Sequence, residues 1–267
     1  MRGQQAVPYA LNNESSTASK MLDCLSEVLD PTTRQLFEAE TLKPNGRYWE
    51  VAAGTGSIAG WLCRTLGPTA EVVATDINTR HVQPAPGLEV RRRDDADGPL
   101  QGRWDGIHAR LALAHWPNRR EVVTGYASAL APGGFLLVED WGPWTGKVLA
   151  SPVPDAAGIY TRYQNALRKV FDSRGNDSTW AESTAEAMLA AGLASAKTTV
   201  NAQTWRGGTP GCILPMLVAA ELRYSLIEHG ATSEDLDVLT AVMSDPDTYV
   251  LGNATWSTIG YASTARA

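Results

Sequence analysis

The sequence predicts an α/β protein with a mostly parallel sheet of seven strands, helices on both faces and further helices that act as a lid. Two observations favour this fold class. Segments rich in β-branched residues alternate with segments of helical periodicity between residues 47 and 139. The turn Gly54-Thr55-Gly56 follows the first of these strands and opens a helix. A chain of 267 residues with 43% hydrophobic content can bury such a core without disulfides or metals.

The N-terminal part is expected to be helical. Apolar positions at helical spacing predict a helix over residues 14–29, and Pro31 is expected to close it. A second short helix is predicted from Thr32 to Leu42. We therefore assign residues 1–46 to an N-terminal helical cap and residues 47–267 to the main domain.

The middle of the chain supplies most of the sheet. Strands are expected over residues 47–52, 71–75, 87–92, 104–109 and 135–139. A helix follows Gly56 and another spans residues 118–130. Because strands alternate with helices, the strands should run parallel.

The C-terminal part departs from plain alternation. Helices are expected over residues 155–172, 179–191, 212–229 and 232–244, and strands over residues 196–204 and 256–261. Helical insertions at about 150–175 and 208–245 exceed what a minimal nucleotide-binding sheet requires. We expect them to cover the carboxyl edge of the sheet, where such folds bind ligands.

The glycine turn alone is compatible with two cofactors. Gly54 and Gly56 permit a tight turn and a close approach of the backbone to a ligand. Twenty residues after Gly56, Asp76 ends the second strand, where a carboxylate can accept both ribose hydroxyls. Together with Ala59, these positions also satisfy the fingerprint of nicotinamide dinucleotide enzymes.

Acidic residues near the turn favour S-adenosylmethionine. Glu50 closes the first strand, four residues before Gly54. A carboxylate there would repel a pyrophosphate but suits a ligand that carries an ammonium group and a sulfonium. Asp94 and Asp95 follow the third strand, where an acid can accept from an adenine amino group.

These motifs, with Arg110-Leu111 after the fourth strand and Pro132-Gly133-Gly134 before the fifth, resemble the class I (Rossmann-like) S-adenosylmethionine-dependent methyltransferases over residues 47–140. The remainder is similar, more loosely, to small-molecule methyltransferases of actinobacteria, including enzymes of natural-product biosynthesis. The resemblance implies a seven-stranded Rossmann-like methyltransferase sheet. Residues 47–267 would form the methyltransferase domain, and the helical insertions would form the acceptor pocket.

The resemblance also implies roles for individual residues. The cofactor would be held by Glu50, Ala52, Gly54, Gly56, Asp76, Ile77, Asp94, the backbone of Asp95, Arg110 and Leu111. The sequence departs from the family's pattern at Ala52, where glycine is usual. The additional methyl group narrows the approach to the ligand without adding charge, so binding should survive it.

The acceptor end is less clearly marked, because methyl transfer is an in-line displacement that needs a base only if the acceptor must lose a proton. The candidate catalytic residues are His115, Asp140 and Tyr9. Trp141, Trp144, Tyr160 and Trp205 are the candidate substrate-binding residues. His108, inside the fourth strand, is expected to be a hydrogen-bonded core residue. The predicted reaction is methyl transfer from S-adenosylmethionine to a small-molecule acceptor, with an aromatic or apolar natural product as the hypothesis.

Composition narrows the partners. A net charge of −6 argues against nucleic acid, which needs a basic surface. No membrane span, signal peptide or metal-ligand spacing stands out, and three cysteines without paired spacing indicate the cytoplasm. A monomer and a homodimer both stay open. The alternatives are an NAD(P)-dependent oxidoreductase and a protein that binds S-adenosylmethionine without methyl transfer, such as a cyclase or a regulatory binder.

Overall fold

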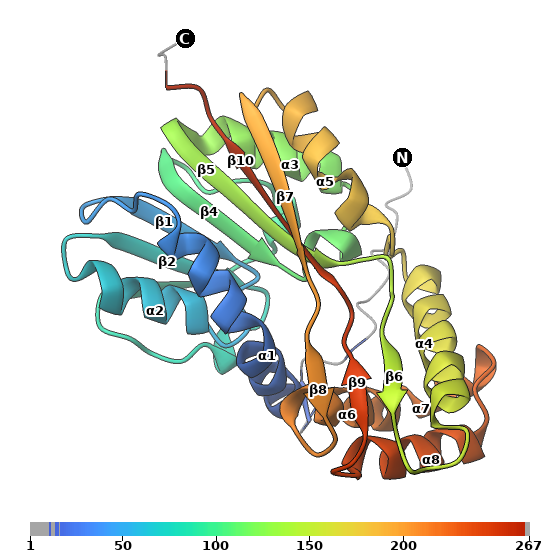
Figure 1. The fold of residues 1–267 in the computed structure, drawn as a ribbon. Coiled ribbons are helices and arrows are strands. Elements are labelled where there is room, and N and C mark those ends of the chain that lie inside the picture. The colour runs from blue at the N-terminus through green and yellow to red at the C-terminus, as the bar shows by residue number, and fades with distance from the viewer. Residues whose placement is uncertain (1–10, 12–13, 16, 265–267) are drawn as a thin grey trace.

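A seven-stranded sheet forms the centre of the molecule in the computed structural model, which describes residues 11, 14–15 and 17–264 (Figure 1). The strand order is β3-β2-β1-β4-β5-β10-β7. The strands are β1 (Arg47–Val51), β2 (Glu71–Asp76), β3 (Leu88–Arg92), β4 (Trp104–Arg110), β5 (Leu130–Trp141), β7 (Ser195–Asn201) and β10 (Thr255–Tyr261). β10 is antiparallel to β5 and β7, and the other neighbours pair in parallel. The predicted mostly parallel sheet is confirmed.

The chain reverses its direction of progress across the sheet between β1 and β4. From β1 it moves outward through β2 and β3, and it then returns to pair β4 with the other side of β1. Such a switch point leaves a crevice beyond the carboxyl ends of the two central strands, which is where open α/β sheets bind ligands.

Helices cover both faces of the sheet. α1 (Ala18–Glu38) and α2 (Ser57–Leu66) pack on one face, where Phe37 and Ile58 share a core cluster with Tyr48 and Leu137. α3 (Arg119–Ala129) and α5 (Trp180–Ala190) pack on the other face. Side chains of a strand alternate between faces, so neighbouring residues of β1 enter different clusters.

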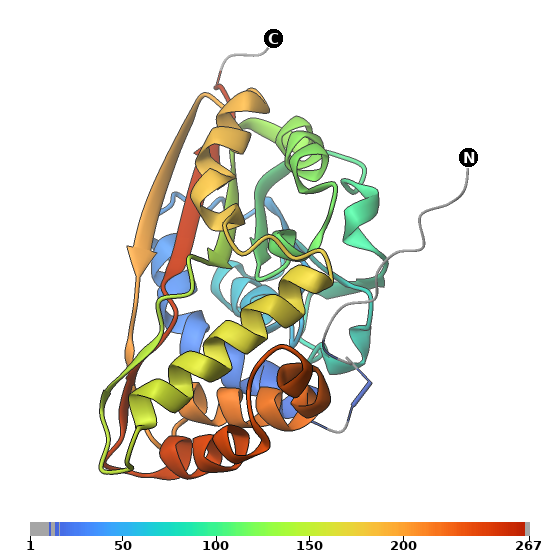
Figure 2. The same cartoon turned by 90° about the vertical axis from the view of Figure 1, so that its right-hand side faces the viewer.

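A second assembly extends the sheet beyond the ends of β5 and β7 (Figure 2). It contains α4 (Ala156–Ser173), α6 (Pro210–Glu221), α7 (Arg223–Glu228), α8 (Ser233–Ser244) and a small sheet of β6 (Lys147–Ala150), β9 (Tyr249–Leu251) and β8 (Thr204–Arg206). Together with the first half of α1, these elements bury one continuous apolar cluster. We call this assembly the cap, a name that from here on does not refer to residues 1–46. Its helices were predicted, although the predicted helix 212–229 is two helices, and its small sheet was not predicted.

The N-terminal helix corrects one prediction. α1 continues through Pro31 to Glu38, so Pro31 does not end a helix and no second helix starts at Thr32. A proline removes one helical hydrogen bond. Burial on both sides of it offsets that loss, because Met21 and Val28 pack into the cap while Phe37 packs into the core beneath the sheet. One helix therefore spans from the cap to the sheet.

Candidate active site

The glycine turn between β1 and α2 adopts a left-handed backbone. φ is +49° at Ala52, +56° at Gly54 and +69° at Gly56, and α2 begins at the next residue. Its first N–H groups are therefore presented at the carboxyl edge of β1. The conformation gives a physical reason for glycine at position 52, since a left-handed residue with a Cβ is strained. Ala52 accepts that strain in this chain.

Glu50 lies buried directly beneath this turn. Its Oε2 accepts a hydrogen bond from the Ala59 N–H at 2.6 Å, in the first turn of α2. Burial raises the pKa of Glu50 to about 8, against the opposing influence of the Arg110 charge and the Ala59 hydrogen bond. Glu50 is thus mostly protonated at pH 7.

The second and third strands contribute acids at the same edge. Asp76 accepts hydrogen bonds from the N–H groups of Gly54 (2.9 Å) and Asn78 (2.8 Å), and burial raises its pKa. The neighbouring Ile77 is 57% exposed, so its side chain is free to cover a flat ligand.

Asp94 and Asp95 have different environments. Asp94 is exposed and its Oδ1 accepts from the Ala96 N–H. Asp95 is buried, and its Oδ2 accepts from the Ala52 N–H (3.0 Å) and the Thr75 hydroxyl (2.7 Å). Burial raises the pKa of Asp95 to about 6. Its carboxyl group therefore braces the left-handed Ala52 peptide from behind.

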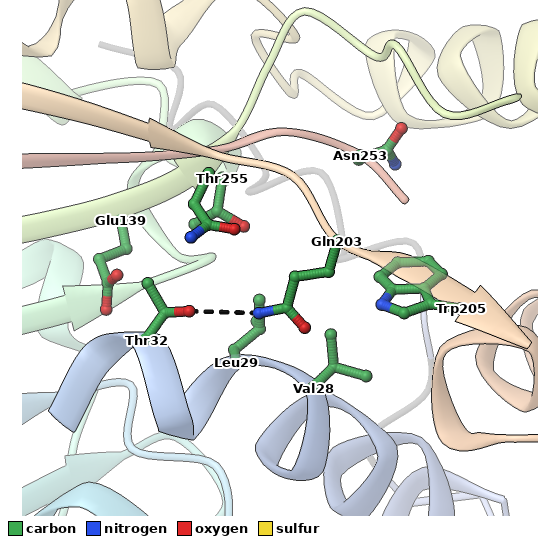
Figure 3. Close-up of a pocket in the computed structure, with 9 residues that line it drawn as sticks. Val28, Leu29, Thr32, Glu139, Gln203, Trp205, Asn253 and Thr255 are labelled. Carbon is green, nitrogen blue, oxygen red and sulfur yellow. Dashed lines mark hydrogen bonds between the residues drawn. The ribbon is translucent and has the colours of Figure 1, made fainter. Parts of the chain in front are cut away.

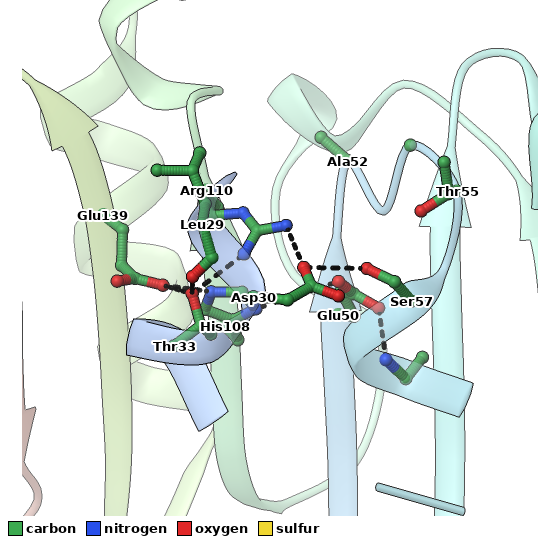
Figure 4. Close-up of polar contacts among 12 residues, drawn as sticks. Leu29, Asp30, Thr33, Glu50, Ala52, Thr55, Ser57, His108, Arg110 and Glu139 are labelled. Carbon is green, nitrogen blue, oxygen red and sulfur yellow. Dashed lines mark hydrogen bonds and ion pairs between the residues drawn. The ribbon is translucent and has the colours of Figure 1, made fainter. Parts of the chain in front are cut away.

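Arg110 connects the end of β4 to α1 (Figure 4). Its guanidinium donates to Asp30 Oδ1 and to the Thr33 hydroxyl, each at 2.8 Å. Asp30 Oδ1 also accepts from the Ser57 hydroxyl at 3.0 Å. The predicted cofactor residue Arg110 is thus part of a polar bridge between α1, β4 and the start of α2. Asp30 and Thr33 were not predicted.

A buried acid–histidine pair lies under the same helix. His108 Nε2 is 3.0 Å from Glu139 Oε2, which also accepts from the Thr33 hydroxyl at 2.6 Å. Glu139 Oε1 accepts from Ser257 at 2.7 Å. Burial would raise the pKa of Glu139, but the hydrogen bond and charge of His108 hold it below its usual value. His108 is the hydrogen-bonded core residue that we predicted, but its partner Glu139 was not predicted.

The alternation of strand side chains contains the missing signal. Glu50 and His108 are register partners on β1 and β4, and Ser257 and Glu139 are register partners on β10 and β5. Residues of one parity on adjacent strands share a face. If alternate residues of each predicted strand had been assigned to the same face, these polar residues would have been predicted to lie together beneath α1.

Two of the candidate catalytic residues, His115 and Asp140, lie near the ends of β4 and β5. Burial, with the nearby Arg119 charge, lowers the pKa of His115 to about 4, so its imidazole is neutral at pH 7. Asp140 is 2% exposed and its pKa is raised well above the usual value by burial and by the Glu139 charge. Asp140 Oδ2 has no hydrogen-bond partner among the described residues.

Apolar side chains gather where β4 and β5 end. Leu111, Trp141 and Trp144 are partly exposed and pack against the cap. Leu111 has φ +52°, a strained backbone that turns the chain at the end of β4. The Trp144 ring lies 5.7 Å from the Phe171 ring, which lies 5.6 Å from His115. The structure therefore brings His115, Leu111 and the two tryptophans to one region.

Tyr160 and Trp205 lie deeper in the cap. Tyr160 is buried and its hydroxyl accepts from Gln164 at 3.0 Å. The Trp205 indole is buried between Gly211 and Gly252, where a Cβ at either glycine would overlap the ring. Trp205 also lines a small pocket between α1 and the β7 edge, opposite Thr32 and Gln203 (Figure 3). Both rings belong to the apolar cluster against which Trp141 and Trp144 pack.

Tyr9 lies outside the described residues. Within the described part of the chain, no cluster of three or more His, Cys, Asp or Glu side chains is placed to bind a metal ion. The same residues include no helix that is both long and apolar enough to cross a membrane.

Comparison with known proteins identifies the family. A family model described as "Methyltransferase domain" matches residues 25–193. A ubiquinone/menaquinone biosynthesis C-methyltransferase of Pseudomonas entomophila (strain L48) is 26% identical over 151 residues, which cover 51% of this chain and 59% of that protein. Methyltransferase GfsG of Streptomyces halstedii is 29% identical over 128 residues, which cover 45% of this chain and 46% of that protein. The chain thus spans less than two thirds of the length of these relatives.

The fold agrees with a solved methyltransferase structure. Phosphoethanolamine N-methyltransferase 2 of Haemonchus contortus, in complex with phosphomonomethylethanolamine and S-adenosylhomocysteine, superposes with a TM-score of 0.57 at 11% identity, covering 95% of this chain and 59% of that one. The site fits the same cofactor, because a buried acid, a left-handed turn and an exposed Ile77 match an ammonium group, a close backbone approach and an adenine. The chain belongs to the class I S-adenosylmethionine-dependent methyltransferases, and its cofactor is S-adenosylmethionine.

Proposed function

We propose that this enzyme transfers the methyl group of S-adenosylmethionine to a small aromatic or apolar acceptor, a natural product, held between the ends of β4 and β5 and the cap. The observation that carries the proposal is the group of partly exposed apolar side chains Leu111, Trp141 and Trp144 at that edge. Aromatic rings with a free face bind flat apolar ligands well. The net charge of −6 supports a small molecule rather than nucleic acid.

The cofactor would be held at the glycine turn. In the proposed arrangement Glu50 faces the ammonium group, Asp76 accepts from the ribose hydroxyls, and Ile77 covers the adenine. Gly54 and Gly56 keep the backbone close, Arg110 and Leu111 close the site from β4, and the exposed Asp94 with the Asp95 backbone meets the adenine edge. The bound cofactor supplies an activated methyl group.

The protein's own contribution is alignment and exclusion of water. The tryptophans orient the acceptor, while the N-terminal helix and the insertions at about 150–175 and 208–245 cover it. A hydroxylated ring must lose a proton before or during transfer. His115, neutral at pH 7, is the candidate acceptor of that proton, and its low pKa of about 4 makes it a weak base. Asp140, held neutral by burial, is better placed to donate a hydrogen bond than to accept a proton.

Two further features support the assignment. The Pseudomonas relative is named for methylation in quinone biosynthesis, which favours an aromatic ring as the acceptor of this chain. The three cysteines are free and buried, which supports a reducing compartment such as the cytoplasm.

A panel of acceptors tests the proposal. We expect release of S-adenosylhomocysteine with phenols or quinols, and none with small polar amines or tRNA. Trp144→Ala should raise the acceptor KM roughly tenfold, the loss expected for one aromatic contact, with an unchanged Kd for S-adenosylhomocysteine. Trp61→Ala, on α2, is the matched control and should leave that KM unchanged. Turnover with amines alone would overturn the proposed acceptor class, and a chain that releases no S-adenosylhomocysteine with any acceptor would be a binder.

A further inference from the structure

His108 faces the proposed cofactor acid Glu50 from the neighbouring strand. Glu50 on β1 and His108 on β4 are register partners. Their exposed fractions are 4% and 2%, respectively. His108 Nδ1 lies 3.9 Å from Glu50 Oε1. The other ring nitrogen, Nε2, lies 3.0 Å from Glu139 Oε2 (Figure 4). The imidazole therefore stands between two buried carboxyl groups.

The hydrogen bonds of Glu139 define the tautomer of His108. Glu139 is an ionised acceptor, because the Thr33 and Ser257 hydroxyls also donate to it. His108 Nε2 therefore carries the hydrogen, and Nδ1 carries a lone pair. Within the described chain, that Nδ1 is buried without a hydrogen-bond partner, which is costly unless the atom has a use in another state of the enzyme.

Glu50 has a matching requirement. Burial raises its pKa to about 8, so it carries a proton before the cofactor binds. An ammonium group is bound by an ionised carboxylate and not by a neutral acid. Binding of the cofactor must therefore move one proton away from Glu50.

We propose that His108 is a positioning residue that takes this proton, so that Glu50 becomes ionised as the cofactor's ammonium group arrives. The inference rests on the proposed role of Glu50. The O–H bond at Glu50 Oε1 breaks and an N–H bond forms at His108 Nδ1, while Nε2–H stays bonded to Glu139. No proton leaves the protein. The positive and negative charges then alternate from the ammonium group through Glu50 and His108 to Glu139, which is the favourable order.

The 3.9 Å between His108 Nδ1 and Glu50 Oε1 is longer than a hydrogen bond, so the proposed transfer requires the two side chains to approach each other. Before binding, burial lowers the pKa of His108, and the proton stays on Glu50. After binding, the ammonium charge favours ionised Glu50, and ionised Glu50 favours a charged imidazole.

The other charged groups around the pair have partners of their own. Asp30 of α1 is bonded to Arg110 and Arg34. Asp76 of β2 accepts from two backbone N–H groups. The charges of Asp30 and Asp76 raise the pKa of Glu50, and the charge of Arg110 lowers it. The pKa of His108 is lowered by Arg110 and raised by Asp30. Cys63 of α2 is a buried thiol, and the nearby charge of Glu50 raises its pKa. Among the described residues of these elements, His108 is thus the neutral base that faces Glu50.

Counting protons by calorimetry tests the inference. S-adenosylhomocysteine, which carries the same ammonium group, is titrated at pH 7 in buffers of different ionisation enthalpy. We expect the unmodified protein to release almost no proton and to bind with an affinity that changes little between pH 6 and pH 8. His108→Gln keeps a donor for Glu139 but cannot accept a proton. It should release close to one proton, and its affinity should rise by up to about tenfold per pH unit. Equal proton release by both proteins would overturn the inference.

A second measurement covers a variant that does not fold. Nitrogen chemical shifts of labelled histidine in the unmodified protein should show one buried imidazole changing from neutral to doubly protonated on addition of S-adenosylhomocysteine. A histidine spectrum that stays neutral shows the inference to be wrong. Glu50→Gln separates this result from a failure of the proposed Glu50 role. Unchanged affinity in that variant would refute Glu50 as the cofactor acid, whereas weakened affinity with a neutral His108 would refute only the proton transfer.

Discussion

The proposed cofactor end and the proposed acceptor end of this site are built in different ways. Around the glycine turn, buried acids bind backbone N–H groups of the turn and of α2, as Glu50 does with Ala59 and Asp76 with Gly54. At the ends of β4 and β5, partly exposed rings such as Trp141 and Trp144 pack on the cap through apolar contacts. Polar bonds of this kind impose fixed geometry, whereas apolar contacts tolerate exchange of one ring for another. The difference suits a cofactor that is held by fixed polar contacts and an acceptor that is held by apolar ones.

Replacing Glu50, in the cofactor end, should have the largest effect, a loss of cofactor affinity. We expect Glu50→Gln to weaken S-adenosylhomocysteine binding by roughly a thousandfold, the loss of a buried charge pair with the ammonium group. Glutamine can still accept from Ala59, so the fold should persist. Calorimetric titration measures the loss. If the acceptor KM rises while the cofactor Kd stays constant, Glu50 belongs to the acceptor end and not to the cofactor end.

The same variant should change the pH dependence of stability. The pKa of Glu50 is raised to about 8 in the folded state, above its unfolded value, so the folded protein holds the extra proton. Stability of the cofactor-free protein should therefore fall as pH rises from about 5 to 8. Glu50→Gln should flatten this fall, by a few kcal/mol at pH 8, because each unit of pKa shift corresponds to about 1.4 kcal/mol. Urea unfolding at pH 5 and pH 8 provides the measurement.

Removing Arg110 should loosen the polar bridge between α1, β4 and the start of α2. Arg110→Met leaves the buried Asp30 without its 2.8 Å partner on β4. We expect a loss of about 3 kcal/mol in the free energy of unfolding. Asp30→Asn in the same chain should recover part of the loss, since the remaining group is then neutral. If the double variant is as unstable as the sum of both single variants, the bridge is not a coupled unit.

Introducing glycine at position 52, in the cofactor end, should have the smallest effect, a small gain in stability. Ala52 has φ +49°, and Ala52→Gly should relieve strain and stabilise the protein by about 1 kcal/mol. Ala53→Gly is the matched control. Ala53 is buried and has no positive φ, so that change should destabilise the protein. Thermal unfolding of both variants distinguishes the signs, and equal shifts would show that position 52 carries no strain.

The contrast between the ends also explains what the sequence could predict. The cofactor end is built from residues at or just after the carboxyl ends of β1, β2, β3 and β4. Alternation of elements, a glycine turn and the charge of Glu50 were therefore sufficient to predict the sheet and the cofactor. Helix propensity indicated the cap helices. Short strands such as β8 and β9 have too few residues for a pattern of their own, because they exist through pairing with each other.

The helix α1 was the main failure, and its physical reason is packing. Proline has a strong local preference for ending helices, and contacts with both the cap and the sheet outweigh that preference at Pro31. Asp30 and Thr33 look like surface residues in a sequence, and they are buried because Arg110 and Glu139 lie opposite them. Local patterns cannot show which distant side chain will be the partner of a polar residue.

The seating of Trp205 between two glycines has a consequence for how this enzyme can diversify. Gly211 and Gly252 are far apart in sequence, yet any side chain at either one would occupy the space of the indole. A smaller residue at 205 would leave a cavity, and a larger one at 211 or 252 would be rejected while the ring is present. The three positions must therefore change together during evolution. In a family tree of this enzyme, they should appear as a single inherited character that divides branches.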